Sequence, residues 1–273
     1  MTYRIYFFMA LFLFSCGKED VLDIQTSNEA LSLCYTADGA NSTIPPAQLL
    51  NLLSWKLTLP TGSSGLPDDI SQPQLATFSV SPYFLISPSG KCVIFNAHAG
   101  GVTTPNSIYP RSELREQTNN GSSNVFWDTD IGKHSLTSTV AITHLPSVKP
   151  DIVVNQIRDT LSDLLMVRLV RKRLYLEGND PTSNSPGAAI DYGTLESNYQ
   201  LGTFFTVRIV VENNKIDVYY NNLILPKYTI FLPVTKTNCY FRAGAYTHSN
   251  VDKGDLPSAY GEAVFTYLDV EHQ

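Results

Sequence analysis

Short strand signals recur along most of this sequence, and turn residues separate them. The signals are runs rich in Val, Ile, Tyr, Phe and Thr in which apolar and polar side chains tend to alternate, as they do in half-buried strands. Gly, Pro, Asn and Ser mark most of the breaks. We predict strands at 55–59, 83–86, 92–97, 111–118, 135–145, 152–158, 164–170, 204–212, 215–220, 239–246 and 263–270.

Helical periodicity is nearly absent, which restricts the fold further. Only 46–53 favours a short helix, and Asn213-Asn214 is typical of a hairpin turn between two alternating runs. Loop-like stretches at 62–74 and 178–200 either cover a binding groove or are plain connectors. Many strands without helices predict an all-β fold, a two-sheet jelly-roll sandwich with a concave polar groove on one sheet.

The first residues have the pattern of an export signal. Arg4 gives a positive start, and the apolar run at 5–14 is shorter than the roughly 20 residues that cross a bilayer. The sequence Leu-Phe-Ser-Cys at 13–16 resembles a bacterial lipobox with Cys16 as the lipidated residue, although an ordinary secretory signal with a chance cysteine is the alternative. We predict a lipoprotein signal peptide at 1–15, a linker at 16–45 and one domain at 46–273.

The composition argues for a sugar-handling sheet protein and against a nucleic-acid binder. The chain has 15 Tyr and 13 Phe, only 16% charged residues and a formal net charge of −6. A local cluster of arginines is therefore informative, because the overall composition does not supply it. We expect a monomer that is anchored by lipid in the outer membrane, with display at the cell surface as one option.

The cysteines permit one disulfide, but the sequence does not identify which two of them form it. If Cys16 is lipidated, Cys34, Cys92 and Cys239 remain, and export permits one pair of them to be oxidised. Their spacing does not identify the pair, and it does not resemble a metal site.

Three of the predicted strands combine a polar face with an apolar one. Because side chains alternate along a strand, the sequence Arg-Ser-Glu-Leu-Arg-Glu at 111–116 places Arg111, Glu113 and Arg115 on one face. Two guanidinium groups with a carboxylate between them suit an acidic ligand, and a solvated ladder of charges is the alternative.

Two later stretches favour the ligand. In Asn-Gln-Ile-Arg at 155–158, Gln156 and Arg158 share a face to which Ile157 does not contribute. The stretch 240–248 has an apolar face and a polar one, with a gap at Gly244. The polar face consists of Tyr240, Arg242, Tyr246 and His248, and the apolar face of Phe241, Ala243 and Ala245.

Taken together and in order, these stretches resemble the signature blocks of polysaccharide lyase family 7, the alginate lyases. The segments 111–116, 155–158 and 240–246 match the three blocks, 55–60 is similar to the family's opening strand, and the resemblance spans about 50–271. It implies a β-jelly roll that cleaves an acidic polysaccharide by β-elimination without a required cofactor. One residue departs from the pattern: Arg158 stands where the family has a histidine, which is the usual proposal for the base on guluronate.

The chemistry of β-elimination assigns roles to these residues. The C5 proton of a uronate is weakly acidic, so donors must neutralise the adjacent carboxylate, each at a gain of about 3 kcal/mol. By their facing, Arg115, Gln156 and Arg158 are candidates for this role, with Arg111 nearby. We predict Arg111, Gln156, Arg158 and Tyr246 as the catalytic residues, with Tyr246 transferring the proton. A cross-strand hydrogen bond for Gln156 and sugar stacking for Tyr246 are the alternatives. We also expect Glu113 to orient Arg111 and Arg115. The predicted substrate-binding residues are Glu113, Arg115, Arg242, Asn155, Tyr240 and His248.

The stereochemistry of the sugar connects Arg158 with the substrate. In mannuronate and glucuronate the C5 proton and the 4-oxygen lie on the same face of the ring, so one tyrosine can remove the proton and return it to the leaving oxygen. In guluronate they lie on opposite faces, and arginine is too persistently protonated to be the second base. We therefore expect a preference for mannuronate-rich alginate or a glucuronate-containing polymer, with His248 as a replacement base being the alternative.

Two other functions are alternatives to a lyase. A lipid-anchored, non-catalytic binding protein for acidic polysaccharides would also account for the missing histidine. A retaining glycoside hydrolase would need two carboxyl groups about 5 Å apart, whereas the polar faces have Glu113 as their one acid.

Overall fold

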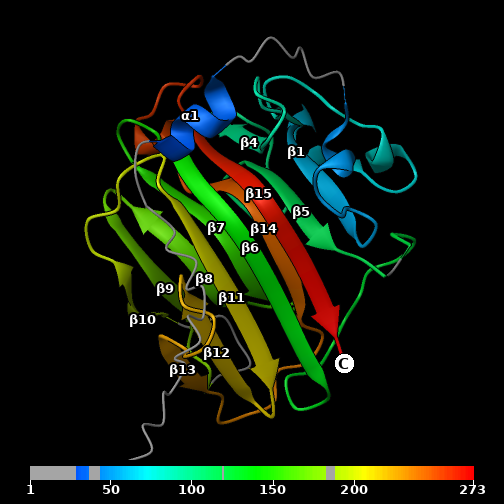
Figure 1. Ribbon diagram of the computed structural model, residues 1–273, viewed down its shortest axis with the longest axis vertical. Helices are drawn as coiled ribbons and strands as arrows, with labels where there is room; N and C mark the ends of the chain where they lie inside the picture. Colours follow the sequence, from blue (N-terminus) through cyan, green and yellow to red (C-terminus); the bar gives the residue numbers. More distant parts are fainter. Residues whose placement is uncertain (1–28, 37–43, 119, 183–187) are drawn as a thin grey trace, which may run out of the picture.

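The strands pack as two antiparallel sheets, face to face, in a computed structural model that describes residues 29–36, 44–118, 120–182 and 188–273 (Figure 1). From edge to edge, the eight-stranded sheet consists of β10 (Ala189–Glu196), β9 (Arg173–Asn179), β8 (Asp163–Val170), β7 (Asp151–Arg158), β14 (Tyr240–Thr247), β5 (Arg111–Glu116), β1 (Trp55–Ser63) and β2 (Leu66–Ile70). The seven-stranded sheet consists of β13 (Tyr228–Phe231), β12 (Lys215–Tyr220), β11 (Phe204–Glu212), β6 (Lys133–His144), β15 (Tyr260–His272), β4 (Val93–His98) and β3 (Phe84–Ile86). The predicted two-sheet sandwich is confirmed.

The core fills the space between the two sheets. On β14 the side chains of Phe241, Ala243 and Ala245 are fully buried in it, as the alternation predicts. Aromatic rings of neighbouring strands meet there, and the ring centroids of Phe95 on β4 and Phe265 on β15 are 5.2 Å apart. Burial of a large apolar side chain contributes about 1.5–3 kcal/mol. The core therefore fixes which face of each strand is left for a site.

Three of the four strands that sequence analysis missed, β2, β10 and β13, lie at sheet edges. Edge strands bury little, so they lack a clear apolar pattern, and β2 contains a proline and two aspartates that are rare in strands. β9 is the fourth. The loops predicted at 62–74 and 178–200 are consequently wrong where they contain β2 and β10, and the helix predicted at 46–53 is one 3-10 turn, Pro46–Gln48.

A short helix, α1 (Glu29–Tyr35), packs on the outer face of the seven-stranded sheet (Figure 1). Cys34 is disulfide-bonded to Cys92, and both lie in a small buried cluster with Ile94, Ala141, Phe204 and Val264. The linker predicted at 16–45 is thus wrong for α1, because this segment is covalently fixed to the domain. Cys239 is a free, buried cysteine, and burial raises the pKa of its thiol.

The predicted signal peptide at 1–15 and Cys16 lie outside the described residues. Among the helices that the structure does describe, none is both long enough and apolar enough to cross a membrane.

Candidate active site

The three polar strands are neighbours in the middle of the eight-stranded sheet, with β14 between β7 and β5 (Figure 1). We refer to the outward side of these strands as the polar face. The residue pairs that stand directly opposite each other on it are Tyr246 and Arg111, Arg242 and Arg115, Arg242 and Gln156, and Tyr240 and Arg158. Three stretches far apart in sequence thus form one surface, as the sequence analysis predicts.

Glu113 is the centre of the polar face. It is fully buried, and its Oε2 accepts hydrogen bonds from Arg111 Nη1 at 2.9 Å and from Arg242 Nη1 at 2.8 Å. Gln156 Nε2 donates to its Oε1. Burial alone would raise the pKa of Glu113, but the charges and hydrogen bonds of the two arginines hold that pKa below its usual range. Glu113 therefore orients Arg111, Arg242 and Gln156.

Glycine at position 244 allows this arrangement. A Cβ added at Gly244 would lie 2.5 Å from the Ser112 carbonyl oxygen and 2.8 Å from the Glu113 Cα. The φ of Gly244 is +147°, which also disfavours other residues. The gap that the sequence indicates at Gly244 is thus needed for the close approach of β14 to the strand that carries Glu113.

Arg115 has partners other than the predicted carboxylate of Glu113. Its Nη1 donates to the Glu116 carbonyl oxygen at 2.6 Å, and its guanidinium carbon lies 4.0 Å from the centre of the Tyr240 ring. Arg242 lies 5.5 Å from the same ring centre. Burial would raise the pKa of the Tyr240 phenol, but the positive charges of Arg242, Arg158 and Arg115 lower it.

Tyr246 lies at the other end of the polar face and is 7% exposed. The guanidinium carbon of Arg111 lies 3.8 Å from the centre of its ring, and Val153 and Met166 pack against it. Its hydroxyl is 2.9 Å from Ser107 Oγ. The guanidinium of Arg111 thus lies over the Tyr246 ring, and the hydroxyl is held by Ser107.

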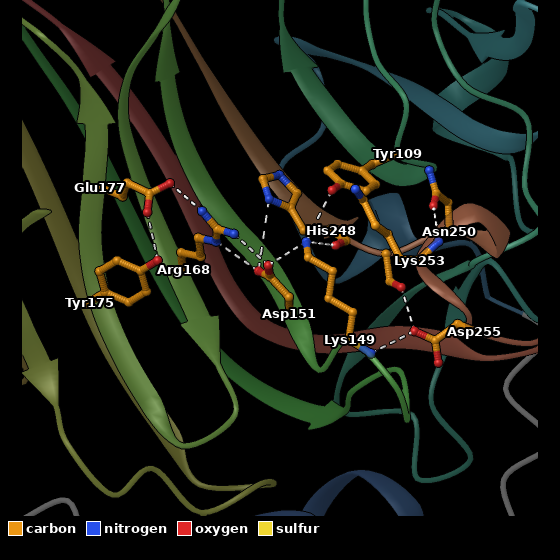
Figure 2. Close-up of polar contacts among 11 residues, drawn as sticks. Tyr109, Lys149, Asp151, Arg168, Tyr175, Glu177, His248, Asn250, Lys253 and Asp255 are labelled. Carbon is orange, nitrogen blue, oxygen red and sulfur yellow. Dashed lines mark hydrogen bonds and ion pairs between the residues drawn. The ribbon is translucent and has the colours of Figure 1, made fainter. Parts of the chain in front are cut away.

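His248 follows Tyr246 on the same side of the chain, and the two rings meet edge to face at 4.3 Å. Figure 2 shows His248 between Tyr109, which stacks on it at 5.0 Å, and Asp151, whose Oδ1 lies 4.0 Å from its Nδ1. Asp151 also accepts two hydrogen bonds from Arg168, at 2.8 and 2.6 Å. Burial lowers the pKa of His248 to about 3, so its imidazole is neutral near pH 7 and is a weak base.

Arg158 and Asn155 differ in where they point. Arg158 Nε lies 3.2 Å from Asp163 Oδ1 at the partly exposed end of β7. Asn155 is fully buried, and its Oδ1 accepts a hydrogen bond at 2.9 Å from Ser138 on the facing sheet. The prediction that Asn155 contacts substrate is therefore wrong, because alternation along β7 places this side chain on the inward face with Ile157.

Comparisons with known proteins agree on one family. A family model described as "Alginate lyase" matches residues 50–272. The chain is 40% identical to alginate lyase AlgAT5 from polysaccharide lyase family 7, over 84% of this chain and 99% of that one, with a TM-score of 0.75. It is 39% identical to the alginate lyase from Corynebacterium sp., over 84% and 98%, also at 0.75. A third structure is alginate lyase A1-II′ with a histidine and a tyrosine replaced, in complex with substrate GGMG (25% identity, 84% and 97%, TM-score 0.71).

The chain belongs to the alginate lyases of polysaccharide lyase family 7. The polar face of this lyase contains the matching blocks, and it departs from the expected pattern at Arg158. Within the described ranges, no three His, Cys, Asp or Glu side chains converge in a way that would hold a metal ion.

Some residues of the lyase that lie close to Tyr246 and His248 do not belong to the three motifs, and the sequence analysis did not predict them. Arg168 gave a usable signal, because a charged residue within the otherwise apolar strand β8 needs a buried partner, and that partner is Asp151. Ser107 and Lys149 lie in connections between strands, where no periodicity marks them.

Because its pKa is lowered, the Tyr240 phenol should ionise at a lower pH than an ordinary tyrosine. Between that pKa and about 10, the folded lyase has a phenolate where the unfolded chain has a phenol. The contribution of Tyr240 to stability is therefore present above pH 10 and is lost as the pH falls through the lowered value. In an ultraviolet titration of the folded lyase we expect one tyrosine to ionise ahead of Tyr192 and Tyr220, whose pKa values burial raises to about 12.

Tyr240→Phe should remove this early step. Tyr267→Phe, on the exposed outer face of the other sheet, is the matched control and should keep it. An unchanged early step in Tyr240→Phe would contradict the assignment.

Proposed function

We propose that this lyase prefers uronates in which the C5 proton and the 4-oxygen lie on the same face of the ring. Mannuronate-rich alginate is the first candidate, and a glucuronate-containing polymer is the second. The observation that supports this preference is the guanidinium at position 158, which is paired with Asp163. Arginine stays protonated in proteins and does not act as the second base that guluronate requires.

In the proposed reaction, Tyr246 removes the C5 proton and returns it to the 4-oxygen of the leaving sugar. Its ring is on the polar face, with the guanidinium of Arg111 over it. His248 is close to Tyr246, but as a neutral imidazole with a pKa of about 3 it is a contact for the sugar and not the base.

Arg111 and Gln156 neutralise the substrate carboxylate in this proposal. Both are hydrogen-bonded to Glu113, so they are oriented before substrate arrives. Preorganised donors stabilise the charge that develops on the carboxylate in the transition state without having to reorganise. Arg242 stands opposite Gln156, and Arg115 and Tyr240 lie on the side of the polar face away from Tyr246. We assign these three residues to the neighbouring sugar.

The test is a comparison of initial rates on polymannuronate, polyguluronate and glucuronan, followed by the ultraviolet absorbance of the unsaturated product. We expect the highest rate on polymannuronate or on glucuronan. A preference for polyguluronate would contradict the proposal. Retained binding without product on any of the three polymers would instead favour a binding protein.

Arg158→His should extend the substrate range. A neutral imidazole at this position would supply a second base, and such groups typically contribute about 100- to 10,000-fold. We expect the ratio of the polyguluronate rate to the polymannuronate rate to rise at least about tenfold. Arg158→Lys keeps a cation without a base at neutral pH and is the control, with no rise expected. An equal rise in both variants would show that the arginine blocks guluronate by its shape.

We further propose that the chain is exported and lipidated on Cys16, which would place it in the outer membrane. The support is the lipobox-like sequence at 13–16. Cys16→Ala should shift the lyase from the membrane fraction to the soluble fraction and abolish labelling by a radioactive fatty acid. Membrane association that persists without Cys16 would contradict this assignment.

A further inference from the structure

The connection between β4 and β5, residues 99–110, brings a hydroxyl to Tyr246 that no strand motif contains. Ser107 Oγ lies 2.9 Å from the Tyr246 hydroxyl oxygen. The same oxygen donates to the Tyr109 carbonyl oxygen at 3.1 Å and accepts from the Tyr109 N–H at 3.1 Å.

These contacts determine the direction of each hydrogen bond. A serine hydroxyl has one hydrogen and two acceptor positions. The Tyr109 carbonyl takes the hydrogen, and the Tyr109 N–H occupies one acceptor position. The second acceptor position is therefore left for the Tyr246 hydroxyl, which donates to Ser107 when Tyr246 is neutral.

The surroundings keep Ser107 in place. Its N–H donates to the Thr104 carbonyl at 3.0 Å, and Asn250 Nδ2 donates to the carbonyl of the next residue, Ile108, at 2.8 Å. The Tyr109 ring is stacked on His248, and Lys149 Nζ lies 4.6 Å from its centre (Figure 2). A rotation of the Ser107 O–H bond can thus reverse the hydrogen bond to Tyr246 without moving the connection.

We propose that Ser107 is a positioning residue for the elimination: it accepts a hydrogen bond from neutral Tyr246 and donates one to its oxygen whenever Tyr246 is ionised. This inference rests on the proposed role of Tyr246 in proton transfer.

The step itself starts from the phenolate of Tyr246, which has released its own proton to solvent. The C5–H bond breaks and its proton passes to the Tyr246 oxygen. The electron pair of that bond forms the double bond between C4 and C5, and the bond from C4 to its oxygen breaks. Tyr246 then gives the proton to the leaving oxygen. Ser107 keeps its own proton throughout and only changes the acceptor to which it points.

The test is Ser107→Ala on polymannuronate, or on the polymer that the wild type cleaves best. Without the hydrogen bond from Ser107, less of Tyr246 is in the ionised form that takes the C5 proton, so kcat should fall about 10- to 100-fold. KM should change little, because Ser107 contacts Tyr246 and not the substrate. Ser107→Thr restores the hydroxyl and should recover most of kcat. Ser197→Ala, an exposed serine between β10 and β11, is the control and should match the wild type.

Three results would overturn the inference: an unchanged kcat in Ser107→Ala, a rise in KM alone, or an equal loss in the Ala and Thr variants. If Ser107→Ala does not fold, Ser107→Cys keeps the size with a weak donor and should show the loss of kcat, whereas wild-type kcat would overturn the inference. A wild type that cleaves no uronate polymer, or a Tyr246→Phe variant with full activity, would instead reject the proposed function.

Discussion

Tyr246→Phe should lower kcat by about 100- to 10,000-fold, which is the contribution that a positioned acid or base typically makes. The substitution removes one oxygen and keeps the ring, so the contacts with Arg111, Val153 and Met166 persist. We therefore expect KM and the melting temperature to stay close to those of the wild type. Product formation should be followed by ultraviolet absorbance, and binding by calorimetry with the same polymer.

The matched control is again Tyr267→Phe, which removes a hydroxyl from the outer face of the other sheet and should leave kcat unchanged. Activity of Tyr246→Phe within about tenfold of the wild type would be too high for the loss of the sole proton-transfer group. In that case another side chain would carry the proton, and Tyr246 would only line the site.

Glu113→Gln should destabilise the fold and abolish activity together. Glutamine has nearly the same shape, but it leaves the buried guanidinium groups of Arg111 and Arg242 without a counter-charge. Removal of one partner of a buried ion pair typically costs about 3–5 kcal/mol. We expect a loss of this size in the free energy of unfolding, measured by urea denaturation.

The activity should fall as well, because Arg111 and Gln156 lose the group that orients them. Asp191→Asn is the control: its ion pair with Arg173 is exposed, and such pairs contribute about 0–1 kcal/mol. A loss of stability in Glu113→Gln no larger than in this control would contradict the central role of Glu113.

The pH dependence provides a second readout for Glu113. Its pKa is lower in the folded state than in the unfolded chain, so the wild type has this contribution to stability above the unfolded value of 4.5 and loses it as the pH falls through the folded value. Glu113→Gln has no such group. Its stability should therefore fall less steeply than that of the wild type in this acidic window.

The alternation of side chains predicted much of the polar face. In 240–246 it separated the core residues Phe241 and Ala243 from Arg242 and Tyr246, and the structure agrees. It did not predict that Glu113 pairs with Arg242 in place of Arg115. That choice depends on which strand lies beside β5, and strand order is a property of the whole sheet.

Two other residues show where the prediction of the site went wrong. Alternation already places Asn155 on the inward face with Ile157, so its assignment to the substrate did not follow from the strand pattern. Sequence analysis also assigned no role to Ser107, since a residue in a connection has no periodic partner. The side chains that complete a site around its strands are for this reason the hardest to predict from sequence.

The disulfide between Cys34 and Cys92 determines on which side of the sandwich the segment with α1 is attached. It fastens α1 to the outer face of the seven-stranded sheet, whereas the polar face is the outer face of the other sheet. A pull on the chain ahead of Cys34 would therefore act on the back of the sandwich. A lipid anchor at Cys16, as proposed above, would therefore leave the polar face directed away from the anchored side. Reduction of the disulfide would release this constraint without any change to the active site.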